Sequence, residues 1–64
     1  MAKWKDYAFY VKCNGNPLML IRVVAENYED AIKFAKNSYH ANHSIYTDDR
    51  YNDWHITPKY RYCN

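Results

Sequence analysis

The stretch YAFYVKCNGNPLMLIRVV, residues 7–24, decides the fold of this chain. In its first part, residues 7–13, the side chains alternate in character, as they do in a strand that buries one face. This pattern predicts a strand whose two faces have different environments. The row expected to point into the core is Tyr7, Phe9, Val11 and Cys13, and the outward row is Ala8, Tyr10 and Lys12.

A tight hairpin is expected directly after this strand. Asn14 and Gly15 lie between two strand-like runs, and both residue types tolerate positive φ, so the pair is a strong hairpin signal. The returning run, residues 18–24, is apolar apart from Arg22 and rich in branched side chains, which favours the central strand of a sheet. Arg22 marks its wetter face. The inward row expected from parity is Met19, Ile21 and Val23.

An amphipathic helix is expected next, from residue 28 to about residue 39. Asn27 is a favourable N-cap residue, and Glu29 and Asp30 in the first turn suit the positive end of the helix dipole. One narrow stripe of this helix is apolar, and only that face can be buried, so the helix should lie across one face of the sheet. The residues of the stripe are Tyr28, Ala31, Ile32, Ala35 and Tyr39.

The remainder of the chain predicts two further strands. Residues 44–47 are a short strand candidate, and alternation resumes at residues 54–57. Pro58 removes a ladder donor, so the last strand should lie at an edge. If pairing resumes after Pro58, one face carries Trp54, Ile56, Tyr60 and Tyr62, and the other carries His55, Thr57, Lys59 and Arg61. The fold class expected is α+β: a single domain, residues 1–64, with a mainly antiparallel sheet of about four strands in ββαββ order and one helix packed on one face.

Length and composition limit the functions that are available. The chain has 64 residues and 7.8 kDa, and it is 48% hydrophobic and 19% aromatic, so it should fold as one small domain. Its thin core leaves no room for a deep enclosed cavity, which argues against a small-molecule enzyme. A net charge of +2 and a pI near 8.6 fall short of the basic stripe of a dedicated nucleic-acid binder. The sequence lacks an apolar run typical of a membrane span or signal peptide, so the expected location is the cytosol.

Side chains capable of chemistry are few and widely spaced. Cys13 and Cys63 are expected to be free thiols in a reducing cytosol, with a bridge between them as the alternative. His40 and His43 suggest a weak metal constellation, which we interpret as solvated surface because histidines also suit a helix C-terminus. The other residues considered for it are Asp48, Asp49, His55 and a cysteine. We therefore expect no metal ligand, no cofactor and no catalytic residue.

The last strand carries the most informative surface. A thin core favours turning its aromatic row inward, and this leaves the basic row of Lys59 and Arg61 outward. Such a row on an edge strand suits an acidic protein surface. With Tyr60 and Tyr62 exposed instead, the strand would stack unpaired bases, as in a platform for RNA or single-stranded DNA.

The sequence AENYEDAIKFA, residues 25–35, follows the expected two-stranded hairpin. Together with the later Tyr39, this segment resembles the small RNA polymerase inhibitors of T7-like phages. That family also carries two arginines at alternate positions shortly before a cysteine, where this chain has Lys59 and Arg61 before Cys63. Small anti-CRISPR proteins of phages have a similar layout of one helix on an antiparallel sheet. The resemblance implies a protein that inhibits a host machine by occupying its surface.

These observations predict a non-enzymatic, phage-type inhibitor that binds a bacterial host protein complex in the cytosol and blocks it sterically. RNA polymerase is the first target expected, and a CRISPR or similar defence complex is the second. The residues expected to contact the partner are Lys59, Arg61, Tyr60, Tyr62, Arg50 and Arg22. The alternative functions are a small single-stranded nucleic-acid-binding protein and an assembly subunit. We expect a monomer or weak dimer without membrane contact.

Overall fold

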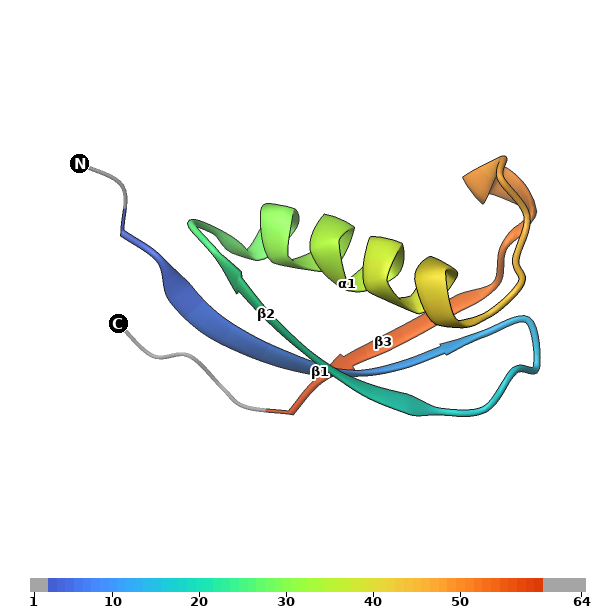
Figure 1. Cartoon of the computed structure of the whole chain (residues 1–64), viewed down its shortest axis with the longest axis horizontal. Coiled ribbons are helices and arrows are strands. Elements are labelled where there is room, and N and C mark those ends of the chain that lie inside the picture. Colours follow the sequence, from blue (N-terminus) through green and yellow to red (C-terminus); the bar gives the residue numbers. More distant parts are fainter. Residues whose placement is uncertain (1–2, 60–64) are drawn as a thin grey trace.

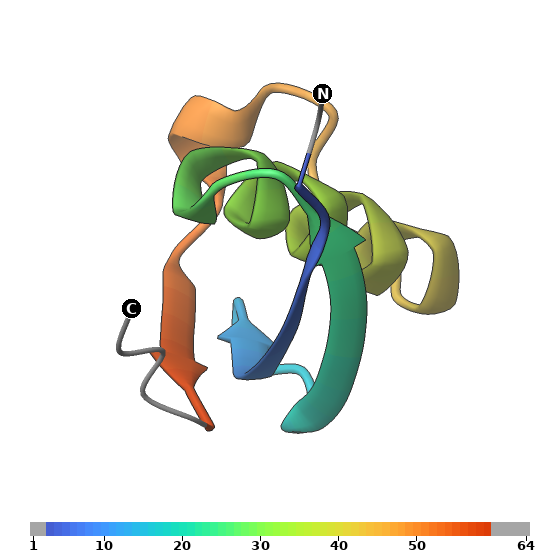
Figure 2. The ribbon, with the colours of Figure 1, turned by 90° about the vertical axis from the view of Figure 1, so that its left-hand side faces the viewer.

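The computed structural model describes residues 3–59, in which three strands and one helix form two layers (Figure 1). The elements are β1 (Lys5–Cys13), β2 (Met19–Ala25), α1 (Tyr28–Asn42), the short 3₁₀ turn η1 (Asp49–Tyr51) and β3 (Trp54–Pro58). The sheet has the order β2-β1-β3 with both pairs antiparallel, and α1 lies across one of its faces (Figure 2). The α+β class and the antiparallel sheet are therefore confirmed.

The hairpin between β1 and β2 forms where the sequence predicts it. Asn14 and Gly15 have φ of 54° and 77°, in the left-handed region that Gly and Asn tolerate best. The N–H of Asn16 donates to the carbonyl of Cys13 at 2.9 Å and closes the turn. This geometry directs β2 back along β1.

The expected order of the sheet is wrong in one respect, because β1 is the central strand and β2 lies at an edge. The apolar run of β2 supplies an inward row and also an outward one, with the side chains of Leu20 and Val24 exposed. β3 instead pairs with the free edge of β1, and this pairing covers Phe9, Val11 and Cys13, which are fully buried. An apolar run alone does not show whether the third strand of the sheet pairs with that run or with the strand beside it.

The helix begins as predicted and continues three residues beyond its expected end. The side chain of Asn27 accepts a hydrogen bond from the N–H of Asp30 at 2.9 Å, which confirms the N-cap. At the other end, the N–H of His43 donates to the carbonyl of Tyr39. Tyr28, assigned from sequence to the buried stripe, is half-exposed at the rim of the core.

The core lies between α1 and the helix-facing side of the sheet, as the parity predicts. Its largest side chain is Tyr39, which is fully buried and donates its hydroxyl hydrogen bond to the carbonyl of Pro17 at 2.8 Å. The other buried members are Tyr7, Phe9, Val11, Cys13, Ile21, Ala25, Ala31 and Ala35. Trp54 and Ile56 of β3 pack against this cluster, so the predicted facing of β3 is also confirmed for its described residues.

The short strand expected at residues 44–47 does not form, and the ββαββ order is wrong to that extent. The side chain of Asn52 accepts from the N–H of Tyr46 at 3.1 Å and donates to its carbonyl at 2.9 Å. The backbone groups that a neighbouring strand would have used are thus occupied by one side chain. β3 is an edge strand of the described sheet, as Pro58 predicts, whereas Tyr60, Arg61, Tyr62 and Cys63 lie outside the described residues.

Within residues 3–59, no helix is long and apolar enough to cross a membrane.

Candidate functional site

The face of the sheet opposite α1 is covered by no further element within residues 3–59, and we call it the open face (Figure 2). The strand pairing places its side chains in rows that cross β2, β1 and β3. The described residues assigned to the open face are Asp6, Ala8, Tyr10, Lys12, Leu20, Arg22, Val24, His55, Thr57 and Lys59.

The row at Ala8 carries a cation on each side. Ala8 of β1 pairs with Arg22 of β2, and on its other side the N–H of Lys59 donates to the Ala8 carbonyl at 2.7 Å. Lys59 lies in a bend directly after β3, and extending the alternation of β3 by one residue assigns its side chain to the open face, like that of Arg22. Strands lie about 4.8 Å apart, so two residues flanking the central strand lie about 10 Å apart at their backbones. The structure therefore brings Arg22 and Lys59, two predicted contact residues, to the same face.

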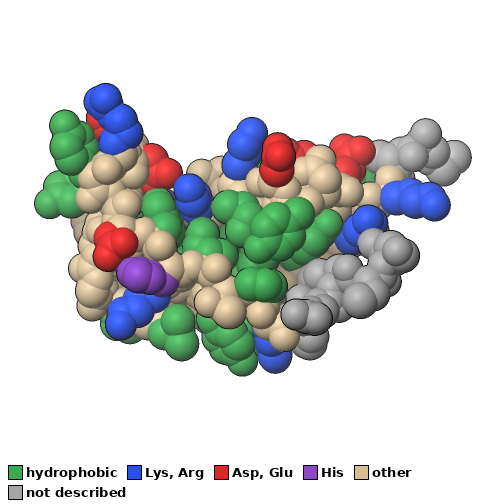
Figure 3. Space-filling view, turned by 180° about the vertical axis from the view of Figure 1, so that it is seen from behind, with side chains coloured by type: hydrophobic (Ala, Val, Ile, Leu, Met, Phe, Trp, Pro, Cys, Tyr) green, Lys and Arg blue, Asp and Glu red, His purple; other side chains and the backbone are tan. Residues whose placement is uncertain are grey.

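The next two rows of the open face, beyond the row at Ala8, are apolar and then basic. Tyr10 lies at the centre of the open face, 38% exposed, and pairs with Leu20, which is 44% exposed. Lys12 and His55 form the next row, with His55 3.2 Å from a carboxylate oxygen of Asp53. The result is an exposed apolar strip flanked by cations, and Figure 3 shows green and blue side chains along the lower margin of the molecule. Aromatic, aliphatic and basic groups at this density are typical of a surface that binds another macromolecule.

Arg50, also predicted as a contact residue, lies elsewhere. It belongs to η1, which Figure 1 places near the C-terminal end of α1, on the helix side of the sheet. Its guanidinium donates to both carboxylate oxygens of Asp48, the shortest contact being 2.7 Å. The position of η1 thus excludes Arg50 from the open face, and its guanidinium pairs with Asp48.

Of the ten residues assigned to the open face, eight were not selected as contact residues from the sequence, among them Lys12, Tyr10, Leu20 and Val24. The parity of β1 already places Tyr10 and Lys12 on its outer face. The missing information was the register, because only the pairing shows that Leu20 and Thr57 flank Tyr10 on the two sides. A strand pattern assigns side chains to faces but does not specify their neighbours in the next strand.

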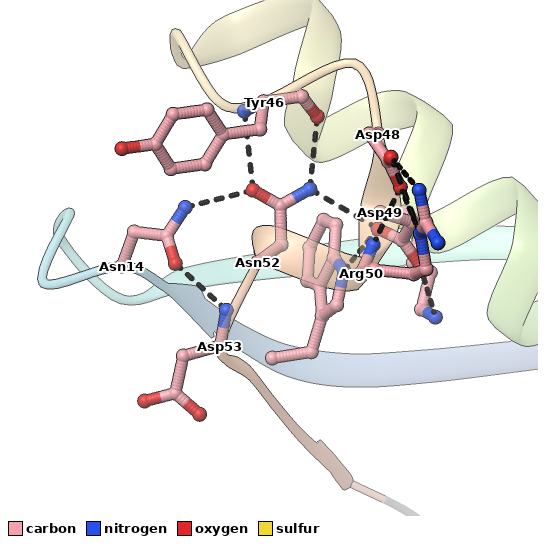
Figure 4. Close-up of polar contacts among 9 residues, drawn as sticks. Asn14, Tyr46, Asp48, Asp49, Arg50, Asn52 and Asp53 are labelled. Carbon is pink, nitrogen blue, oxygen red and sulfur yellow. Dashed lines mark hydrogen bonds and ion pairs between the residues drawn. The ribbon is translucent and has the colours of Figure 1, made fainter.

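A hydrogen-bonded cluster fixes the loop that precedes β3 (Figure 4). Besides the two bonds to the Tyr46 backbone, the Asn52 amide accepts from the side chain of Asn14 at 2.8 Å and donates to Asp49 at 3.1 Å. Asn14 also accepts from the N–H of Asp53 at 2.7 Å, which ties this loop to the β1–β2 hairpin. One amide therefore connects three segments of the chain.

We expect Asn52→Ala to lower the free energy of unfolding by about 1–2 kcal/mol, because four hydrogen bonds are lost from a partly exposed site. Amide hydrogen exchange at Tyr46 should accelerate at the same time. Urea unfolding followed by circular dichroism, with exchange measured by NMR, tests both effects. Asn37→Ala, an exposed helix position, is the control, and equal results for the two variants would refute this function of Asn52.

Asp49 makes the same loop sensitive to acid. It accepts a hydrogen bond from the Trp54 indole, and this bond, with those from Asn52 and Lys36, holds the pKa of the Asp49 carboxyl below its ordinary value. A lowered pKa means that the ionised group stabilises the folded loop fully above the ordinary pKa. That contribution is lost as the pH falls through the lower, folded-state pKa.

The acid titration of the Trp54 indole N–H resonance should therefore have its midpoint below the ordinary aspartate pKa of 3.8. Asp49→Asn should remove this transition, because the amide does not titrate. A midpoint at or above 3.8 in the unmodified protein would contradict the assigned hydrogen bonds.

The groups considered for catalysis or metal binding are not assembled into a reactive site in the described part of the chain. No group of three or more His, Cys, Asp or Glu side chains within residues 3–59 is arranged to hold a metal ion. Cys13 is fully buried, and burial raises the pKa of its thiol, so the protonated form is favoured. A buried, protonated thiol is a packing group and a poor nucleophile.

Comparisons with protein-family models, with curated proteins and with solved structures found no match to this chain. The class that the fold and the open face define is accordingly a small α+β domain with an exposed, apolar and basic sheet surface.

Proposed function

We propose that this protein is a non-enzymatic inhibitor of the phage type, which binds a host protein complex through the open face and blocks it sterically. The single observation that supports this proposal is the composition of that face, where Arg22, Lys12 and Lys59 surround an exposed apolar strip at Tyr10 and Leu20. The likeness of residues 25–35 to phage inhibitors of RNA polymerase supports the choice of the first target.

The charge on the open face favours an acidic partner. Lys12, Arg22 and Lys59 are cations, whereas Asp6 is the carboxylate that the described strands place on this face. Complementary charge steers a partner toward the surface and speeds association. The exposed tyrosine and aliphatic side chains then supply the apolar area from which most of the affinity comes.

A protein partner fits this face better than unpaired bases. Sheet platforms that bind single strands stack two or three bases on aromatic rings. Within residues 3–59, the open face offers one exposed tyrosine ring, that of Tyr10, and the imidazole of His55 in the next row, beside aliphatic Leu20 and Val24. Single-stranded nucleic acid is therefore the second candidate partner.

A transcription assay with purified bacterial RNA polymerase tests the proposed function. Added protein should lower the yield of transcript from a single promoter in proportion to its occupancy of the enzyme. Arg22→Glu should restore the yield, and the exposed Lys3→Glu is the matched charge reversal outside the open face. Unaffected transcription would exclude RNA polymerase and direct the same assay design to a purified CRISPR interference complex.

A further inference from the structure

A separate cleft lies on the helix side of the sheet, between the later turns of α1 and the loop that leads through η1 to β3. Its volume is about 460 Å³, enough for one or two side chains of a ligand. The residues that line it are Lys33, Lys36, Asn37, His40, Ile45, Tyr46, Thr47, Asp49, Asn52 and Trp54. None of them belongs to the open face.

Three side chains of the cleft, those of Lys36, Asp49 and Trp54, contact one another, and the two charged ones have opposite signs. The ammonium of Lys36 lies 3.1 Å from a carboxylate oxygen of Asp49 and 5.4 Å from the centre of the Trp54 ring. Asp49 also accepts the indole hydrogen bond of Trp54. The charges of Lys36 and Asp49 thus offset each other, and the indole is held in one orientation.

The helix wall of the cleft carries a lysine, Lys33, and an imidazole, that of His40. Lys33 and His40 are seven residues apart, two turns of α1, and therefore lie on the same side of the helix. Both are exposed, and Lys33 has no ion-pair partner within residues 3–59. Asn37 lies between them and offers a further amide donor.

The opposite wall carries aromatic groups that are already ordered. Tyr46 lines the cleft and is 62% exposed, and its ring makes an edge contact with Tyr51 at 6.1 Å. The Arg50 guanidinium carbon lies 5.9 Å from the Tyr51 ring centre. In Figure 3 this end of the molecule, at the upper left, carries green and blue side chains that stand apart from the main body. Because Asn52 fixes the Tyr46 backbone, a ligand can contact these rings with little ordering cost.

We propose that this cleft binds an acidic peptide segment. A carboxylate of the peptide lies toward Lys33 and His40, and its neighbouring apolar side chain packs between Tyr46 and Trp54. The charge on the helix wall selects the carboxylate, and the aromatic wall selects a peptide over a simple anion. A nucleic acid is disfavoured because, among the residues that line this cleft, Lys33 is the lysine without an ion-pair partner within residues 3–59, and one such cation is too few for a run of phosphates.

The site can be tested without knowing the natural partner. The probes are an acetylated, amidated pentapeptide of sequence Gly-Glu-Leu-Glu-Gly and its counterpart with glutamine at both acidic positions. NMR titration of isotopically labelled protein should shift the Trp54 indole N–H and the amides of Tyr46 and His40 with the acidic peptide. Lys33→Glu should weaken that binding by about tenfold, whereas Lys12→Glu on the open face should change it by less than about twofold.

Three outcomes would overturn this proposal. The first is an equal response to the glutamine peptide, which would show that charge does not select the ligand. The second is a loss of binding in Lys12→Glu with Lys33→Glu unaffected, which would move the site to the open face. The third is full competition by a short oligothymidylate, which would show a general polyanion surface. All three are independent of whether the protein inhibits a host complex.

Discussion

Tyr39→Ala is expected to remove a large part of the stability of the protein. Tyr39 is the largest fully buried side chain, and it joins α1 to the hairpin loop through its hydroxyl bond to the Pro17 carbonyl. Truncating a buried aromatic residue costs about 3–5 kcal/mol. A chain of 64 residues has a total stability of roughly 3–10 kcal/mol, so a large part of the folding free energy is removed.

Tyr39→Phe separates the two contributions of this side chain. It keeps the ring, with its edge contact to Trp54 at 5.7 Å, and removes only the hydroxyl that satisfies Pro17. We expect a loss of about 1–2 kcal/mol for this variant. Phe34→Ala, at an exposed position of the same helix, is the control and should cost less than about 1 kcal/mol. Thermal unfolding followed by circular dichroism gives all three values, and a Tyr39→Ala protein as stable as Phe34→Ala would refute the packing described here.

Reversal of charge at Lys12 and Arg22 together is expected to reduce partner binding by about 100-fold. Each reversal replaces an attraction to an acidic partner by a repulsion, at about 1.4 kcal/mol or one factor of ten per site. Both side chains are exposed on the open face, so the fold should keep its stability within about 0.5 kcal/mol.

The salt dependence of binding distinguishes the two candidate partners for this face. Binding to an acidic protein surface should weaken moderately as salt is raised. Binding to single-stranded nucleic acid should fall steeply, with a slope set by the number of phosphates contacted, and should quench tyrosine fluorescence through stacking. If the double variant binds its partner with unchanged affinity, the open face is not the binding surface.

Local features of this fold were predictable because their signals are local. The Asn14-Gly15 turn and the Asn27 cap are each decided by a few neighbouring residues, and both form as expected. The strand at residues 44–47 failed for a reason that lies outside its own sequence, since Asn52, six residues beyond Tyr46, occupies both backbone groups of Tyr46. Apolar alternation indicates that a segment can pair as a strand. Hydrogen bonds from a competing side chain to its backbone determine whether it does so.

The candidate site was predictable only in part, because it depends on register. Arg22 was correctly placed on the wetter face of its strand, yet its nearness to Lys59 exists only because both lie opposite Ala8. Arg50 looked equivalent in the sequence, but it belongs to η1, which lies on the helix side of the molecule, and its guanidinium pairs with Asp48. Pairing across a sheet joins residues that are far apart in the chain, so the spacing of residues within one strand does not specify it.

The central claim is that the open face binds a protein of the host. The most direct test is affinity capture from bacterial lysate, with and without nuclease, using the unmodified protein and the Lys12→Glu, Arg22→Glu double variant in parallel. We predict a stoichiometric protein partner that survives nuclease treatment and is lost with the double variant. A partner that disappears with nuclease, or one that the double variant retains in full, would contradict the claim.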